Sequence, residues 1–539
     1  MFRLENRGLI NRAKRLSFAF NGKKLYGYEG DTLASALLAN GTHLVGRSFK
    51  YHRPRGIFSS GSEEPSALVQ LAVGANTEPN IRATTVQLFD GLTANSQNHF
   101  GPLEWDLMRV NDFLSPFLSA GFYYKTFMWP KSFWEKIYEP IIRKAAGLGK
   151  LSGEPDPSTY DKGFLHCDLL IIGAGPSGLQ SALMAARSGA KVIIADEDFL
   201  LGGSLNGDNF QINNDTAINW VKNTIEELVS FKNVRLMPKT TIYGAFDHGI
   251  FGALEVKTNF DRLRSSKPRQ VLWRIYAKQS VLCSGSSERS LLFGNNDRPG
   301  IMLSRSVRQY CNRWGIIPGK KVSIYTNNDD GWITARDLKE AGCNVVMVID
   351  ERSDIAAPIK NVDYRLGKKV IDTKGSLRIS SLSLDDGTKV ETDCLAVSGG
   401  FNPNVHLTCH ERGRPKWQEK NQCFIPGKKP KGMAVVGAAN GVFDLNHISE
   451  ENNLKMKEIL SHLGYKHQGK IKLTAAQKSY NVAPFSKSLA KGKVWVDLQN
   501  DVTVKDIKIA VQEGFHSVEL LKRYTTLGMA TDQGKTSNV

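Results

Sequence analysis

The segment at residues 167–205 constrains the fold of this chain more than any other, and it reads CDLLIIGAGPSGLQSALMAARSGAKVIIADEDFLLGGSL. Its short apolar run, DLLII, is typical of a parallel strand that is buried on both faces. Gly173, Gly175 and Gly178 then form the pattern G-x-G-x-x-G. The first glycine permits a tight turn, the second lets the backbone approach a pyrophosphate, and the third lets helix and strand pack closely. We therefore predict a dinucleotide site at the N-terminus of the following helix, where free N–H groups favour negative charge.

The carboxylate that such a site needs comes after the next strand, KVIIA. Asp196 follows that strand about 20 positions after Gly173, the separation expected for an acid that accepts hydrogen bonds from the adenosine ribose. A second glycine pair, Gly202 and Gly203, lies where flavoproteins with two dinucleotide-binding domains keep one close to the cofactor. The residues predicted to contact the nucleotide are Gly173, Gly175, Pro176, Ser177, Gly178, Asp196, Glu197, Gly203, Ser204, Gly285 and Gly437.

A second strand–helix–strand is predicted at residues 319–352, after a strand and turn at 280–289. Flavoproteins of this class interrupt their first domain with such a second Rossmann unit. Its turn, TNNDDG, lacks the glycine pattern, although Asp350 occupies the place of the ribose-binding acid. Two interpretations stay open: a retained structural domain, or a second nucleotide site with an altered phosphate turn.

The chain returns to the first domain at residues 394–407 and 432–445. In flavin-binding relatives the second of these segments carries Gly-Asp, whose carboxylate holds a hydroxyl on the flavin side. Here Gly437 is followed by Ala438. The adenosine half of the site is complete while the flavin half lacks its anchor, so we expect NAD rather than FAD in this chain.

Both ends of the chain resemble iron–sulfur modules. Residues 16–41 predict a β-hairpin around Asn21-Gly22 and then a helix capped at Asp31 or Thr32, the start of a ferredoxin-like β-grasp. In cluster-bearing forms the next loop carries C-x4-C-x2-C. That spacing places the first three ligand positions at Ser59, Glu64 and Ala67.

Residues 497–537 resemble a small helical [2Fe–2S] module that begins with C-x-C and closes with C-x4-C. The matching positions hold Asp497, Gln499, Asp532 and Ser537. Because the irons of such clusters need thiolates, we expect no iron–sulfur cluster, and no other metal, at either end. Both modules are interpreted as packing and interface elements.

The composition favours several domains of an ordinary soluble protein: 539 residues, 41% hydrophobic and 23% charged. The seven cysteines are scattered and odd in number, which suits free thiols in a reducing cytoplasm. We expect a cytoplasmic protein without membrane contact, because there is no signal peptide and no apolar run near the ~20 residues of a membrane span. The net charge of +18 is spread along the chain without a recognition motif, which disfavours nucleic acid. A basic host proteome, an acidic partner subunit and an anionic substrate stay open as explanations of the charge.

No residue is a convincing acid, base or nucleophile, so no catalytic residue is predicted. Three histidines are interpreted as structural: His43, His52 and His406. The basic loop KYHRPRG leaves three interpretations open, a partner interface, an attraction for an FMN phosphate, and a solvated loop; its charged residues are Lys50, Arg53 and Arg55. The aromatic run at residues 122–140 is interpreted as a connector packed across domains.

Several stretches together resemble the alpha subunit of heterotetrameric sarcosine oxidase: GDTLASALLANGTHLVGRSFKYHRPRGIF, AGFYYKTFMWP, GAGPSGL, FGNNDRPGIMLS, YTNND and KRYTTLGMATDQGKTSN. The resemblance covers essentially the whole chain and corresponds to the N-terminal half of that subunit. It implies NAD in this chain, FAD and substrate in a beta subunit, FMN between alpha and beta, and gamma and delta subunits besides. Sarcosine would be oxidised by hydride transfer to FAD, and electrons would pass through FMN to oxygen, giving glycine, a formaldehyde-level one-carbon unit and hydrogen peroxide.

The resemblance also implies that this chain is inactive alone. The tetrahydrofolate-binding half of the family's alpha subunit is missing from the sequence, so we expect either a fragment or a separately encoded folate half. Two alternatives stay open: the corresponding subunit of an N-methylglutamate dehydrogenase, and a non-catalytic NAD-binding scaffold.

The predicted fold is α/β, with a flavoprotein-type core of two Rossmann-like dinucleotide-binding domains, an N-terminal ferredoxin-like β-grasp domain and a C-terminal small helical domain. The predicted boundaries are 1–95 for the β-grasp, 96–163 for an aromatic-rich connector and linker, 164–300 for the first part of the NAD-binding domain, 301–385 for the inserted Rossmann-like domain, 386–465 for the return of the first, and 466–539 for the helical module.

Overall fold

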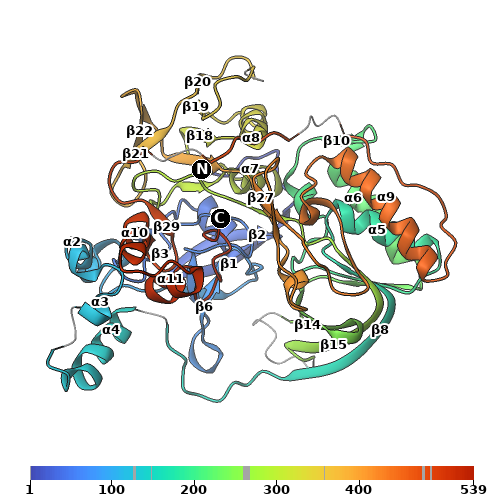
Figure 1. Cartoon of the computed structure of the whole chain (residues 1–539), viewed down its shortest axis with the longest axis horizontal. Coiled ribbons are helices and arrows are strands. Elements are labelled where there is room, and N and C mark those ends of the chain that lie inside the picture. The colour runs from blue at the N-terminus through green and yellow to red at the C-terminus, as the bar shows by residue number, and fades with distance from the viewer. Residues whose placement is uncertain are drawn as a thin grey trace. The chain divides into compact units, whose positions relative to one another are not determined.

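A computed structural model of the chain describes residues 2–125, 129–146, 149–258, 267–356, 359–475, 480–485 and 489–539 (Figure 1). The chain folds as two compact units. Unit 1 comprises Met1–Asp156, Glu288–Gly399 and Phe485–Val539, and unit 2 comprises Pro157–Ser287 and Gly400–Pro484. The predicted α/β fold class is confirmed. The domain boundaries stay predictions, and the segments of the predicted connector at 126–128 and 147–148 lie outside the described residues.

Unit 2 is built on a seven-stranded sheet whose central strand, β8, is parallel to both of its neighbours. The strands in order are β12 (Val234–Met237), β9 (Val192–Ala195), β8 (Tyr160–Ile172), β15 (Gln270–Leu282), β14 (Ile250–Val256) and β13 (Thr240–Phe246), and β28 (Met433–Val435) also pairs with β15. Helices α5 (Pro176–Arg187), α6 (Ala217–Ser230) and α9 (Leu445–His462) pack together beside this sheet (Figure 1).

The predicted burial of β8 on both faces is confirmed. Leu169 and Ile171 belong to the core that the three helices cover, whereas Leu170 and Ile172 belong to the core on the opposite face. Successive side chains of a strand point to opposite faces, so a continuous apolar run is what a strand covered on both sides requires. The shorter elements of unit 2 are β10 (Gln211–Ile212), β11 (Asp215–Thr216), β25 (Phe401–Pro403), β26 (Lys416–Gln418), β27 (Cys423–Ile425) and the 3-10 turns Gly203–Gly207, Asp247–Gly249, His406–Cys409 and Gly437–Asn440.

The β-grasp of unit 1 is a five-stranded sheet in the order β2 (Lys23–Glu29), β1 (Asn11–Phe20), β7 (Leu92–Ser96), β5 (Leu68–Leu71) and β6 (Glu78–Arg82). The predicted hairpin is confirmed: Phe20 pairs with Lys23, and the two residues between them have φ angles of 50° and 76°, as an Asn-Gly turn requires. Helix α1 (Leu33–Ala39) begins at the predicted cap Thr32, whose Oγ1 accepts the Ser35 N–H at 3.1 Å.

The predicted second Rossmann-like unit is also present in unit 1. Its parallel sheet has the order β17 (Ile301–Leu303), β24 (Cys394–Ser398), β18 (Val322–Thr326), β19 (Val345–Asp350) and β20 (Tyr364–Leu366). Helices α7 (Ser304–Trp314) and α8 (Asp329–Glu340) pack against it and against each other. A small antiparallel sheet follows, with β21 (Val370–Lys374), β22 (Ser381–Leu384) and β23 (Lys389–Glu391).

The C-terminal module of unit 1 contains β29 (Trp495–Asp497), β30 (Val502–Thr503), α10 (Val504–Gln512) and α11 (Val518–Thr525). The connector after the β-grasp is made of short helices: α2 (Val110–Phe113), α3 (Phe122–Lys125), the π-helical turn Trp134–Tyr138 and α4 (Glu139–Ala146). The expectation that its aromatic run is packed is wrong for Trp129, which is 84% exposed.

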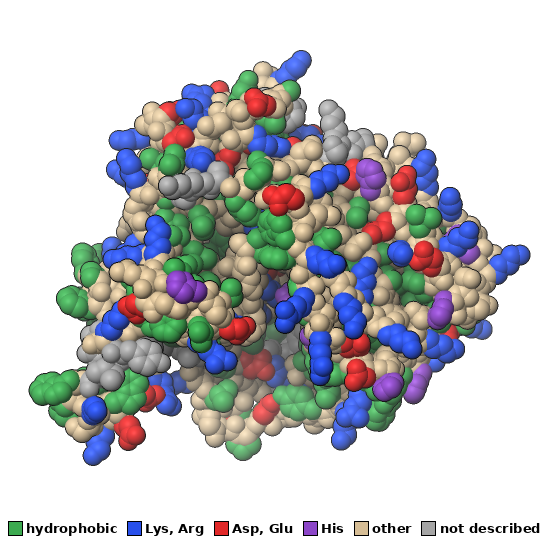
Figure 2. All heavy atoms as spheres, in the orientation of Figure 1, with side chains coloured by type: hydrophobic (Ala, Val, Ile, Leu, Met, Phe, Trp, Pro, Cys, Tyr) green, Lys and Arg blue, Asp and Glu red, His purple; other side chains and the backbone are tan. Residues whose placement is uncertain are grey.

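The positive charge forms no single stripe on the face in view: Figure 2 shows Lys and Arg side chains scattered over it among Asp and Glu. Within the described ranges, every helix is too short or too polar to cross a membrane.

Candidate dinucleotide-binding site

The turn between β8 and α5 has the backbone geometry that the glycine pattern predicts. Gly173 has φ +101°, and a Cβ there would lie 2.4 Å from the carbonyl oxygen of Cys283. A Cβ on Gly178 would lie 1.9 Å from the carbonyl oxygen of Gly173, so the helix packs closely on the turn. At Gly175 the nearest atom to such a Cβ is a Cα at 4.0 Å, so this side of the turn is open to a ligand. Packing thus requires glycine at Gly173 and Gly178, whereas Gly175 leaves open space of the kind that a phosphate can approach.

Helix α5 begins without a side-chain cap. Gly175 is its N-cap residue and Pro176 takes the first position, where the missing N–H costs nothing. The amides of the first turn are therefore left for an external acceptor, and the helix dipole favours an anion there. This is the arrangement that holds a pyrophosphate.

Asp196 lies directly after β9 and braces the same turn. Its carboxylate accepts the Ala174 N–H at 2.6 Å and the Asp198 N–H at 2.8 Å. Burial raises the pKa of Asp196 to about 7, despite those two backbone donors. The neighbouring predicted residue, Glu197, is exposed. The acid is therefore positioned beside the phosphate turn, where the ribose of a dinucleotide would extend from the pyrophosphate.

The remaining predicted residues converge on the ends of β8, β15 and β28. A Cβ on Gly203 would lie 2.8 Å from the Cα of Gly175, and one on Gly437 would lie 2.1 Å from Ser177 Oγ. Gly285 follows β15 with φ +68° and open space beside it, and Ser204 continues from Gly203 in a 3-10 turn. Parallel strands end at one edge of the sheet, so the structure brings together the glycine-rich segments that the sequence separates by more than 200 positions.

The sequence patterns did not predict one residue that lies beside this site. Glu451 of α9 accepts the Gly437 N–H at 2.8 Å and the Asn440 side-chain N–H at 2.6 Å. A carboxylate therefore lies next to Ala438 although the sequence motif lacks one. No local pattern identifies it, because the contact joins a helix to a turn that comes before it in the chain.

In the second Rossmann-like unit, the turn before α8 and the carboxylate of Asp350 already have hydrogen-bond partners within the protein. Asn328 caps α8 by accepting the Asp330 N–H at 3.0 Å, and it donates to the carbonyl of Ser398 at 3.0 Å. The fully buried carboxylate of Asp350 accepts from the Trp332 indole at 2.8 Å and from Arg352 at 2.8 Å. These contacts favour the structural interpretation over a second nucleotide site.

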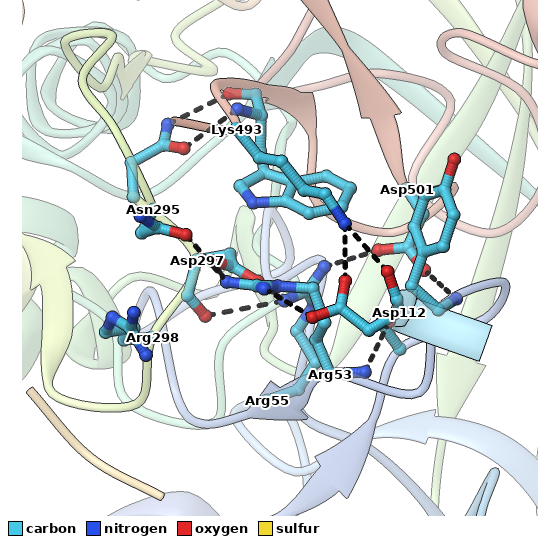
Figure 3. Close-up of polar contacts among 12 residues, drawn as sticks. Arg53, Arg55, Asp112, Asn295, Asp297, Arg298, Lys493 and Asp501 are labelled. Atoms are coloured by element: carbon cyan, nitrogen blue, oxygen red, sulfur yellow. Dashed lines mark hydrogen bonds and ion pairs between the residues drawn. The ribbon is translucent and has the colours of Figure 1, made fainter. Parts of the chain in front are cut away.

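The basic loop is not solvated, because its two arginines are neutralised inside unit 1. Arg53 donates to Asp297 at 2.6 and 2.8 Å and to Asp112 at 3.0 Å, and Arg55 pairs with Asp297 and Asp501 (Figure 3). The interpretation as an exposed basic loop is therefore wrong for both arginines. Their charges are also taken by carboxylates, which disfavours a phosphate-binding role.

Of the three histidines interpreted as structural, His52 is fully buried and His43 is half-buried, whereas His406 is exposed, so burial supports that interpretation only for the first two. Burial lowers the pKa of His43 to about 3, and His52 Nδ1 lies 2.6 Å from Asp106 Oδ2.

In each iron–sulfur-like module, three of the predicted ligand positions are linked by hydrogen bonds that involve a buried carboxylate. At the N-terminal module the buried Glu64 carboxylate accepts the N–H groups of Phe58, Ser59, Ser66 and Ala67 at 2.6–2.9 Å. At the C-terminal module Gln499 Oε1 accepts the Asp532 N–H at 2.9 Å, and Asp497 accepts the Gln499 N–H at 2.9 Å. Burial raises the pKa of Asp532 to about 6.

Three family models match parts of the chain. Residues 13–99 match a 2Fe-2S iron-sulfur cluster binding domain, residues 168–245 match an FAD dependent oxidoreductase, and residues 491–539 match the sarcosine oxidase A3 domain. The first match contradicts the expectation that the chain carries no iron–sulfur cluster, and we withdraw that expectation. It rested on ligand positions assigned by residue spacing, at Ser59, Glu64 and Ala67 for the first module, whereas the match extends over the whole β-grasp.

The solved structure of L-proline dehydrogenase from P. horikoshii superposes with a TM-score of 0.66 over 100% of this chain and 92% of that one. At 20% identity, this likeness shows the fold alone.

Two curated relatives extend over nearly the whole chain. The sarcosine oxidase subunit alpha of Rhizobium meliloti (strain 1021) is 48% identical over 100% of this chain and 55% of its own length. That of Corynebacterium sp. (strain U-96) is 33% identical over 98% of this chain and 53% of its own length. The chain thus spans about half the length of the curated relatives it matches. By sequence, it belongs to the family of sarcosine oxidase alpha subunits.

Proposed function

We propose that this chain binds NAD at the turn between β8 and α5 and acts as the dinucleotide-binding subunit of a sarcosine oxidase complex. The observation that carries the proposal is the turn itself. Its open side at Gly175, the uncapped N-terminus of α5 and the adjacent carboxylate of Asp196 supply the three contacts that a dinucleotide needs.

The residues of this chain bind and orient; they do not perform the bond-breaking step. The amides of α5 would hold the pyrophosphate, and Asp196 would accept hydrogen bonds from the ribose. NAD, when bound, supplies a nicotinamide ring that accepts or donates a hydride. In the proposed overall reaction, sarcosine, oxygen and water give glycine, formaldehyde and hydrogen peroxide on a flavin held by a partner subunit; the relatives named sarcosine oxidase subunit alpha support sarcosine as the substrate.

FAD is the second candidate for the same turn, and two observations favour it. Residues 168–245 match an FAD dependent oxidoreductase model, and Glu451 supplies a carboxylate beside Ala438. Release of the bound nucleotide by denaturation, followed by chromatography and mass spectrometry, separates the two. NAD in stoichiometric amount supports the first proposal, whereas FAD replaces it with the second.

The catalytic part of the proposal is tested by oxygen uptake with sarcosine. The chain alone should consume no oxygen, and its complex with a flavin-bearing partner should turn over, because amine oxidation needs a flavin ring oriented beside the substrate. Turnover by the chain alone contradicts the proposed division of labour. A well-formed complex that oxidises N-methylglutamate but not sarcosine assigns the chain to that dehydrogenase. A complex that oxidises neither favours the scaffold.

A further inference from the structure

One exposed face of the sheet in unit 2 carries aromatic side chains where a solvent-facing sheet normally carries polar ones. It is formed by the neighbouring strands β8, β15, β14 and β13, whose opposite face packs into the core through Ile275, Phe251 and Ala253. The outward positions hold five exposed large side chains and an exposed arginine, which together are called the aromatic face: Tyr160, Phe164, Tyr243, Phe246, Leu272 and Arg274. A sheet with one solvated side usually alternates apolar and polar residues, so an outer side rich in aromatic rings indicates a binding surface.

The register of the strands places these side chains on one surface, across which β8, β15 and β14 lie side by side (Figure 1). Phe164 of β8 pairs with Arg274 of β15, and Arg274 pairs with Gly252 of β14. Residues that pair across strands share one face of a sheet. A Cβ on Gly252 would lie 2.5 Å from the ring of Tyr243, so this ring from β13 covers the glycine. The Phe164 and Tyr276 rings also lie together, with centroids 6.4 Å apart, and the aromatic face thus extends from β8 to β13.

The area of the aromatic face is that of a protein-binding surface. Its four aromatic side chains are 48–61% exposed: Tyr160, Phe164, Tyr243 and Phe246. An aromatic side chain can bury about 200 Å², so these four rings leave about 400 Å² in contact with water. That is half of the area that one partner contributes to a standard interface, about 800 Å², and Leu272, which is 45% exposed, adds to it. Single exposed apolar side chains are ordinary, whereas a contiguous group of this size marks an interaction site.

The charge on this face is positive and is not neutralised by the chain itself. Lys162 and Arg274 are both exposed on it, because they alternate with inward-facing residues along β8 and β15. Within the part of the chain that the structure describes, neither cation forms an ion pair, whereas Lys278 farther along β15 pairs with Asp168 at 2.7 Å. Two copies of the face related by a twofold axis would bring these like charges toward each other, which is unfavourable. The charges therefore favour a different protein that presents carboxylates.

We propose that the aromatic face is the docking surface for the flavin-bearing partner subunit, which contacts it through an apolar surface that carries acidic residues. The identity of this partner rests on the proposed function, whereas the chemistry that the partner presents follows from the face alone. The rings bury apolar area, and Lys162 and Arg274 pair with carboxylates of the partner, which sets the orientation of the two proteins. Arg274 lies between Phe164 and Gly252 in the middle of the sheet, so its ion pair is the one most fully removed from water.

The first test is hydroxyl-radical footprinting of the whole chain, alone and in its reconstituted complex with the flavin-bearing subunit. The complex should reduce to about one fifth the oxidation of four side chains: Tyr160, Phe164, Tyr243 and Phe246. Tyr364 of β20, which is 43% exposed, should be oxidised equally in both samples. Footprinting reads the exposure of the rings directly, and it therefore reports on this face whether or not the complex is active.

The second test measures the affinity of the two subunits by calorimetry. Arg274→Glu should weaken binding about thirtyfold, because it places a carboxylate opposite the acidic residues of the partner. Phe164→Ser, which removes one ring without adding charge, should weaken it about tenfold. Lys222→Glu is the matched control, because Lys222 is a cation of unit 2 that is 72% exposed on α6, outside this face, and it should leave the affinity unchanged. All three positions are exposed, so the variants should fold as the wild type does.

The outcomes separate this proposal from the proposed function. Unchanged oxidation of the four rings in a complex that turns over sarcosine overturns the docking proposal and leaves the proposed function standing. Protection of the rings in a complex without sarcosine turnover supports docking and contradicts the proposed function. A dimer of the chain alone, detected by light scattering and dissociated by Phe164→Ser, assigns the face to a second copy and overturns the proposal. Failure of the two subunits to associate overturns both.

Discussion

Replacement of Asp297 tests whether the buried ion pairs of unit 1 hold its three chain segments together. This carboxylate, 1% exposed, bonds Arg53 and Arg55 of the N-terminal segment, and Arg55 in turn pairs with Asp501 near the C-terminus (Figure 3). Asp297→Asn keeps the shape of the side chain and removes its charge. Loss of one partner of a buried pair costs about 3–5 kcal/mol, because the remaining charge stays desolvated. We expect about 3 kcal/mol here, since Asp112 and Asp501 still neutralise the two arginines in part.

Asp112→Asn is the matched control. Asp112 bonds the same Arg53 at 3.0 Å and Lys493 at 2.6 Å, but its side chain is 29% exposed. Water screens such a pair, so we expect a loss below about 1 kcal/mol. Native-state hydrogen exchange gives the free energy of unfolding for peptides covering residues 50–58, 292–300 and 493–501. It avoids the mixed transition that denaturant produces in a chain of two compact units.

The pH dependence of the difference follows from the charge of Asp297. The two guanidinium groups hold its pKa well below the usual range, although burial opposes them. A carboxylate with a lowered pKa stabilises the folded state fully above its unfolded pKa of about 4, and that contribution is lost as the pH falls further. The difference in the free energy of unfolding between wild type and Asp297→Asn should therefore be constant from pH 5 to 8 and shrink below about pH 4. The reasoning is refuted if Asp297→Asn lowers the free energy of unfolding by no more than Asp112→Asn does. It is also refuted if the loss appears only in peptides of unit 2.

Three further predictions concern the turn between β8 and α5 and the acid beside it. Gly175→Ala should keep the melting temperature within about 2 °C, because its Cβ meets no atom nearer than 4.0 Å. The same methyl group should block the pyrophosphate and weaken nucleotide binding at least tenfold. Equal affinities of wild type and variant by calorimetry would contradict this prediction. Gly178→Ala should instead destabilise unit 2, since its Cβ would lie 1.9 Å from a carbonyl oxygen, and an unchanged melting temperature speaks against it. Asp196→Ala should weaken NAD binding by about 1–3 kcal/mol. Burial raises the pKa of Asp196 to about 7, so the NAD affinity of the wild type should fall as the pH drops from 8 to 6. The NAD affinity of Asp196→Ala should not change over this range. Parallel pH profiles would exclude Asp196 as the acceptor of the ribose hydrogen bonds.

Local patterns predicted much of the candidate site because each depends on residues that are close in the chain. The close contact of Gly178 with Gly173 lies within six residues, and the Asn21-Gly22 hairpin depends on two positive φ angles. The contact of Gly173 with Cys283, in contrast, exists only in the folded chain. The same reasoning did not predict Glu451, whose contact with Gly437 depends on how α9 packs beside the sheet.

The sequence by itself determined the α/β class, the phosphate turn, the helix caps and the membership of the alpha-subunit family, because periodicity, glycine spacing and homology are properties of the linear chain. Only the tertiary structure decided the state of the charged and reactive groups. In the sequence, Arg53 and Arg55 form a basic loop. In the folded chain, Asp297 and Asp501, which come from distant segments, neutralise both arginines. Asp196 follows its strand as the motif predicts, but only its burial in the folded chain raises its pKa to about 7. Charge, acidity and reactivity depend on burial and on neighbours, and the neighbours of a side chain are fixed only when segments far apart in the sequence pack together.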